Sequence, residues 1–224
     1  MVLLILAVNF IGFAHTYYLA GLLHAPLPSA IVHVHGALFT CWLLLLLTQT
    51  VLVSMGRVRW HRRLGVLGGV IAALMLIAGP LVLVGALRRH AFSQNEGYVI
   101  FAADLCSLTL FAFFVASGLL RRNDSAVHKR LMLFASIAIL APGLSRWSFA
   151  FMVSPYAFYG IYLAFPIAIL LFDLVTLRKV LRVTLLGSVL VTIYIFGVGP
   201  LSHTALLHRI TDAIQQQPSS SRKP

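Results

Sequence analysis

The most informative part of this chain is the stretch Pro28-Ser-Ala-Ile-Val-His33-Val-His35-Gly36-Ala-Leu-Phe-Thr-Cys41-Trp42-Leu-Leu-Leu-Leu-Leu-Thr-Gln49. Most of it is apolar, and as a helix it is long enough to cross the roughly 30 Å hydrocarbon core of a bilayer. It also carries two histidines near one end and a glutamine near the other. Because an ionisable group inside a membrane span is costly, its presence indicates a functional site. The stretch therefore predicts a transmembrane helix with a buried histidine.

The spacing of the polar side chains predicts which way each one faces. His35, Trp42 and Gln49 follow one another at intervals of seven residues, so they form one stripe along the helix. We expect this stripe to face the interior of the protein. His33 lies about 200° round the helix from His35, at ~100° per residue. It shares its face with small residues, so we expect it to pack against a neighbouring helix.

The composition excludes a soluble domain. Of the 224 residues, 60% are hydrophobic and only 10% are charged, which is typical of an integral membrane protein. The two cysteines, Cys41 and Cys106, lie inside apolar segments, so we expect neither a disulfide framework nor a cysteine zinc motif. The formal charge is +12, but the basic residues lie between apolar stretches, as membrane topology requires. We therefore expect no nucleic-acid partner.

The apolar stretches predict an all-α, polytopic transmembrane bundle of about seven helices. The predicted spans are 1–23, 28–54, 64–87, 98–120, 129–152, 156–177 and 181–207. Six spans remain an alternative if the weakest stretch does not cross. The first stretch has no basic residue before it and no small-residue cleavage site after it, so we expect a helix rather than a signal peptide. Residues 1–210 form one domain, and the polar tail 211–224 is expected to be disordered.

The distribution of Lys and Arg predicts the orientation. The second, fourth and sixth connections carry four, four and three of these residues, whereas the others carry none, two and none. Basic connections stay in the cytoplasm. We therefore expect a cytoplasmic N-terminus and a C-terminal tail on the outer side.

With this orientation, the polar residues of the spans fall into two layers. The outer layer contains six ionisable residues: His15, His33, His35, Asp104, Arg146 and His203. The cytoplasmic layer contains Gln49, His61, Arg62, Arg63, His128, Lys129, Arg130 and Asp173. His61-Arg-Arg-Leu-Gly and His128-Lys-Arg-Leu-Met each open a span, which indicates a weak internal repeat and places the two histidines at one depth.

Histidines at equal depth on two helices can be the axial ligands of a haem, and imidazole also binds transition metals. The candidate pairs are His61 with His128, and His35 with His15 or His203. The candidate cofactor-binding residues are therefore His33, His35, His61 and His128, for haem b or a transition metal. His33, His35 and Asp104 form an alternative metal site with a position left open for water.

The polar residues of both layers also have a purely structural interpretation. Trp42, Gln49, Arg146 and Asp173 are expected to form polar contacts between helices. Asp104 with Arg146 is a candidate buried ion pair, and Asp173 is a candidate partner of Arg178 and Lys179 at the interface. The basic side chains beside the two cytoplasmic histidines are candidate ligands of lipid phosphates: Arg62, Arg63, Lys129 and Arg130. His15 and His33 can simply hydrogen-bond to a neighbouring helix.

The chain resembles a family of uncharacterised bacterial multi-pass membrane proteins in the motifs His33-Val-His35-Gly36, His61-Arg62-Arg63-Leu64-Gly65 and His128-Lys129-Arg130-Leu131-Met132, with Trp42, Gln49, Arg146 and Asp173. The resemblance covers roughly residues 10–180 and implies a helical fold in the bacterial inner membrane, but no reaction. The two motifs in which a histidine is followed by basic residues at the start of a helix are more distantly similar to those of small membrane proteins that include a factor for cytochrome-oxidase maturation.

Ser29-x3-His33 also resembles the first element of the membrane zinc hydrolases of the progestin/adiponectin-receptor and ceramidase group. The chain departs from that pattern because four residues separate His203 from His208 and because Asp104 falls on the fourth span. Three functions remain open. The first is a haem- or metal-binding bundle in respiratory or redox chemistry, and the second is an accessory or assembly subunit of a larger membrane complex. The third is a metal-dependent membrane hydrolase.

Overall fold

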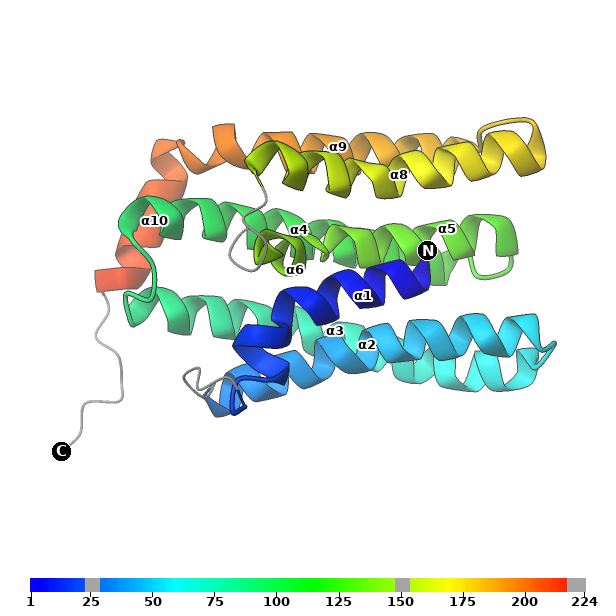
Figure 1. Ribbon diagram of the computed structural model, residues 1–224, viewed down its shortest axis with the longest axis horizontal. Helices are drawn as coiled ribbons and strands as arrows, with labels where there is room; N and C mark the ends of the chain where they lie inside the picture. The colour runs from blue at the N-terminus through cyan, green and yellow to red at the C-terminus, as the bar shows by residue number, and fades with distance from the viewer. Residues whose placement is uncertain (23–28, 148–153, 217–224) are drawn as a thin grey trace.

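The computed structural model describes residues 1–22, 29–147 and 154–216, which form a bundle of helices with no strand among them (Figure 1). In chain order the elements are α1 (Val2–Phe13), the π-helical segment η1 (Ala14–Tyr18), α2 (Ala30–Ser54), α3 (Val58–Arg88), α4 (Gln94–Leu120), α5 (Ser125–Ala138), α6 (Ala141–Ser145), α8 (Pro155–Leu177), α9 (Arg182–Ser202) and α10 (Ala205–Gln216).

Within the described residues, six helices are long and apolar enough to cross a membrane, and the shorter apolar segment Val2–Tyr18 precedes them. α5 and α6 together make one of the six, Ser125–Ser145. This arrangement confirms the predicted all-α multi-pass bundle of about seven helices. The predicted boundaries differ most at two places: α3 begins at Val58 instead of residue 64, and the last predicted span is divided between α9 and α10. Residue 23 of the first predicted span and residues 148–152 of the fifth lie outside the described residues.

The basic connections gather at one end of the bundle. The turns α2–α3, α4–α5 and α8–α9 lie together at the right of Figure 1, and the N-terminus lies toward the same end. These turns contain Arg57, Arg121, Arg122, Arg178 and Lys179, all exposed. By the positive-inside rule the sequence predicts that this end lies in the cytoplasm, so it is called the cytoplasmic end and the opposite one the outer end. The turn α3–α4, η1 and α10 lie at the outer end.

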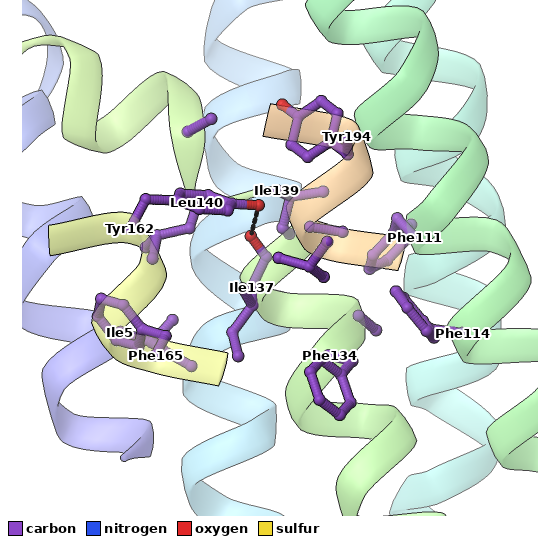
Figure 2. Close-up of a cluster of buried hydrophobic side chains, with 14 of the residues drawn as sticks. Ile5, Phe111, Phe114, Phe134, Ile137, Ile139, Leu140, Tyr162, Phe165 and Tyr194 are labelled. Carbon is purple, nitrogen blue, oxygen red and sulfur yellow. Dashed lines mark hydrogen bonds between the residues drawn. The ribbon is translucent and has the colours of Figure 1, made fainter. Parts of the chain in front are cut away.

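α5 is the central helix of the bundle. The span that α5 forms with α6 is the least apolar of the six and the most deeply buried inside the protein. Figure 2 shows the surrounding core, to which α1 contributes Ile5, α4 Phe111 and Phe114, α8 Tyr162 and Phe165, and α9 Tyr194. The Tyr162 hydroxyl donates to the carbonyl oxygen of Ile137 at 3.0 Å, near the end of α5. A helix in this position needs small and polar residues for close packing more than it needs apolar ones for lipid.

Close packing of backbones fixes the position of α6 against α1. A Cβ atom added to Gly12 would overlap the backbone of Gly143, including its carbonyl oxygen. Gly12 therefore brings α1 within backbone contact of α6, as small residues commonly do between membrane helices. Pro142 stands in the first turn of α6, and α5 ends three residues before α6 begins. This break in the helix lets α6 pack against α1.

At the outer end, α10 folds back over the bundle. It follows α9 after His203 and Thr204 and packs against α3 and α4, with Leu207 and Thr211 buried. α10 includes residues 211–216, so the prediction of disorder is wrong for this part of the tail. The remainder of that predicted tail, 217–224, lies outside the described residues.

Candidate functional site

The two histidines of the weak repeat face each other at the cytoplasmic end. His61 is the fourth residue of α3 and His128 is the fourth residue of α5, so the repeated motif opens both helices in the same register. Their ring centroids are 6.1 Å apart, with the ring planes at 84°. The hairpins α2–α3 and α4–α5 place both helix starts at the same end of the bundle. His61 and His128 therefore lie at the same depth, as predicted, and are also side by side.

The hydrogen bonds of the pair leave one nitrogen on each ring available. His128 Nδ1 lies 2.8 Å from the carbonyl oxygen of Gly118 on α4. A carbonyl only accepts, so Nδ1 carries the proton and Nε2 of the neutral ring keeps a lone pair. His61 Nδ1 is buried and has no hydrogen-bond partner. Gln49 of α2 also has a buried side-chain oxygen without a partner, Oε1.

A buried ion pair lies beside the histidines and ties three helices together. The Arg130 guanidinium of α5 donates to both carboxylate oxygens of Asp173 on α8, and Arg130 and Asp173 are only 2% and 0% exposed. Asp173 Oδ2 also accepts from Thr184 Oγ1 at 2.5 Å and from the backbone N–H of Leu181 at 3.2 Å. The carboxylate thereby caps the start of α9, where Leu181 offers no side-chain cap.

This ion pair corrects two predictions. Arg130 does not face lipid phosphates, because it lies about 200° round α5 from His128 and points into the bundle. Asp173 does not pair with Arg178 or Lys179, which are both exposed, whereas Asp173 is fully buried. The three other basic residues predicted to contact lipid phosphates are exposed: Arg62, Arg63 and Lys129. Of these, Arg63 covers the Trp60 ring and Lys129 covers the Phe172 ring.

The outer layer forms a looser cluster around Arg146, directly after α6. Arg146 donates to the carbonyl oxygen of Pro142 at 2.6 Å, and its guanidinium carbon is 4.3 Å from the Phe13 ring centroid. It lies close enough to His35 and Asp104 for an electrostatic interaction with each. Asp104 and Arg146 do not form the direct ion pair proposed from the sequence, since no contact within 4.0 Å joins them. His35 packs on Phe39 and has a buried Nδ1 without a hydrogen-bond partner.

The other outer histidines lie apart from this cluster. His15, His33 and His203 are exposed, and His33 sits beside the Tyr17 ring at 5.6 Å between centroids. Across residues 1–22, 29–147 and 154–216, no three or more His, Cys, Asp or Glu side chains form a group that could hold a metal ion. The structure therefore does not gather His33, His35 and Asp104 into one ligand set.

The stripe His35–Trp42–Gln49 does face the protein, and it reveals contacts that the sequence did not indicate. Trp42 is buried and donates from Nε1 to Ser136 Oγ of α5 at 3.1 Å. Ser136, Thr184 and the Gly118 carbonyl all complete polar contacts, yet none is distinguishable in the sequence from ordinary residues of a membrane helix. A buried hydroxyl or carbonyl of this kind becomes informative only when its neighbour is known.

Comparison with known proteins adds no relative: no protein-family model, no curated protein and no solved structure matches this chain.

Proposed function

We propose that this protein binds haem b or a transition metal ion between His61 and His128, and that it serves respiratory or redox chemistry in the bacterial inner membrane. The observation that carries the proposal is the facing pair itself. Two histidines from matching positions on α3 and α5 lie 6.1 Å apart between ring centroids. The resemblance of the motifs to those of bacterial multi-pass proteins supports the bacterial membrane, and the basic end of the bundle supports a site next to the cytoplasm.

The chemistry of the two side chains fits this assignment. The Gly118 carbonyl holds His128 in the tautomer that presents Nε2 as a ligand, and such an orienting hydrogen bond is usual for a metal-binding histidine. His61 Nδ1 is a buried polar atom that lacks a partner, and such groups normally find one. Metal–imidazole bonds are about 2 Å long, so two rings that share one ion are separated on the scale observed here. Two histidines from two helices would suit haem iron or a copper ion better than a zinc site, which needs three protein ligands.

The residues around the pair have defined roles in this proposal. Arg62, Arg63 and Lys129 are exposed next to the two histidines and supply positive charge for anionic groups of a haem or for lipid phosphates. The buried Arg130–Asp173 pair holds α5 against α8 and α9, so it fixes the first turn of α5 that carries His128. A bound haem or copper ion would supply reversible one-electron transfer. His61 and His128 hold the site, and the rest of the network keeps them in place.

The test compares bound metal in purified variants. His61→Ala and His128→Ala should each lose most of the iron or copper that co-purifies with the unchanged protein. His33→Ala is the matched control, because His33 is exposed and belongs to the first turn of α2, which begins at the other end of the bundle. It should keep the full content. Equal metal content in all four proteins would overturn the assignment to this pair. No colour and no metal in the unchanged protein would favour the accessory-subunit function.

A further inference from the structure

The C-terminal helix α10 exposes an apolar stripe on one flank. Leu206 is 70% exposed and Ile210 is 42% exposed, and the exposed Ala213 continues the same line. Residues four and seven positions apart lie on one side of a helix, so the three side chains form a continuous stripe. Leu207 and Thr211, by contrast, are buried against the ends of α3 and α4. The apolar stripe is therefore additional to the face that anchors α10 to the bundle.

The opposite flank of α10 is polar and points toward α4. His208 stacks on the Tyr98 ring with centroids 3.8 Å apart, and the Tyr98 hydroxyl donates to Asp212 Oδ1 at 2.8 Å. Asp212 and Gln215 also line a shallow, open pocket with His90 and Gln94, near the α3–α4 turn. At ~100° per residue, the stripe of Leu206 and Ile210 is on the other side of the helix from His208 and Asp212. The apolar stripe consequently faces away from this pocket, toward the periphery.

The position of α10 places this stripe at the edge of the bilayer. Figure 1 shows α10 at the left of the view, running across the outer end of the bundle, and it packs against the membrane-spanning helices α3, α4 and α9. The preceding helix α9 exposes Ile193 and Phe196 on its own surface, which is the surface that a membrane span turns toward lipid. Leu206 comes only four residues after the end of this membrane-spanning helix. A helix with separate apolar and polar sides is suited to the membrane interface.

We infer that α10 is an interfacial helix of the outer leaflet: Leu206, Ile210 and Ala213 insert among the acyl chains, and Arg209 lies at the level of the lipid phosphates. Arg209 is exposed, and it lies on the side of α10 away from the buried residues. The occupant of the stripe is thus the lipid itself. The polar contacts of His208 and Asp212 set the rotation of the helix, so the stripe cannot turn toward water without breaking them.

The test measures lipid exposure residue by residue in nanodiscs of phosphatidylcholine and phosphatidylglycerol. Nitroxide labels are attached to Leu206→Cys, Ile210→Cys and Arg209→Cys in a background with Cys41→Ala and Cys106→Ala. At positions 206 and 210, collision with oxygen should exceed collision with a water-soluble nickel chelate severalfold. At position 209 the preference should reverse.

Two results would overturn the inference. Equal ratios at the three positions would show that the stripe faces water. Immobile labels with spin–spin broadening at 206 and 210 would show that a second copy of the chain covers it. If the cysteine-free background does not fold, Leu206→Trp and Gln216→Trp are compared in the otherwise unchanged chain with brominated phosphatidylcholine. Leu206→Trp should be quenched more strongly, and equal quenching would contradict the inference.

Discussion

Replacing Asp173 by alanine should strongly destabilise the protein, because several buried groups depend on this one carboxylate. The Arg130 guanidinium would keep only its hydrogen bond to the Ala126 carbonyl, at 2.7 Å, inside a site where it is 2% exposed. The Thr184 hydroxyl and the Leu181 N–H would also lose their acceptor. α9 would then begin without a cap.

The expected cost follows from this arrangement. Removing one member of a buried ion pair typically costs about 3–5 kcal/mol, because the other charge stays buried without compensation. Replacing both members by apolar residues of similar size is often neutral or stabilising. The double variant Arg130→Met/Asp173→Leu should therefore recover most of the stability lost in Asp173→Ala, even though it removes more polar contacts.

The assay is thermal unfolding of the detergent-purified proteins. Asp124→Ala is the matched control, since Asp124 is exposed and caps α5 through the N–H groups of Ala126 and Val127. Loss of such a cap costs about 1 kcal/mol. The unfolding midpoints should rank unchanged protein, Asp124→Ala and Asp173→Ala in descending order, with the double variant above Asp173→Ala. A midpoint for Asp173→Ala equal to that of Asp124→Ala would show that the buried pair has no special weight, as would a double variant less stable than Asp173→Ala.

Two further substitutions probe packing in the same unfolding assay. Gly12→Ala should lower the free energy of unfolding by about 1–3 kcal/mol or more, because its Cβ would overlap the backbone of Gly143. Gly160→Ala should have little effect, because nothing lies within 4 Å of the added Cβ. Similar unfolding midpoints for the two variants would contradict the close contact of α1 with α6. Trp42→Phe should lower the free energy of unfolding by roughly 1 kcal/mol, because the hydrogen bond to Ser136 is lost. Ser136→Ala should then lower it little further in the Trp42→Phe background. Fully additive losses of stability would argue against that hydrogen bond.

The sequence predicted those features that depend on hydropathy and charge along the chain. Apolar stretches of sufficient length identified the bundle, and the basic connections were correctly expected to share one end of it, whose cytoplasmic location stays a prediction. The matching motifs at His61 and His128 predicted a common depth, because each motif opens a helix after a basic turn. The seven-residue spacing of Trp42 correctly indicated a residue that faces the protein.

Lateral partners could not be predicted in the same way. Asp173 pairs with Arg130, 43 positions away, whereas nearby Arg178 and Lys179 offered a misleading local choice. Which face of α8 meets which face of α5 depends on packing between helices, and no periodicity in one helix contains that information. α10 was missed for a different reason: its apolar and polar residues occupy separate sides of the helix, so its average hydropathy resembles that of a polar tail.

The most direct test of the histidine site is the absorption spectrum of the unchanged, detergent-purified protein, oxidised and then reduced with dithionite, with metal analysis of the same sample. We expect about one iron or copper per chain. If the metal is haem iron, a Soret band and sharp bands in the reduced spectrum should accompany it. A sample with no visible absorption and no bound metal would contradict the assignment of His61 and His128 as ligands.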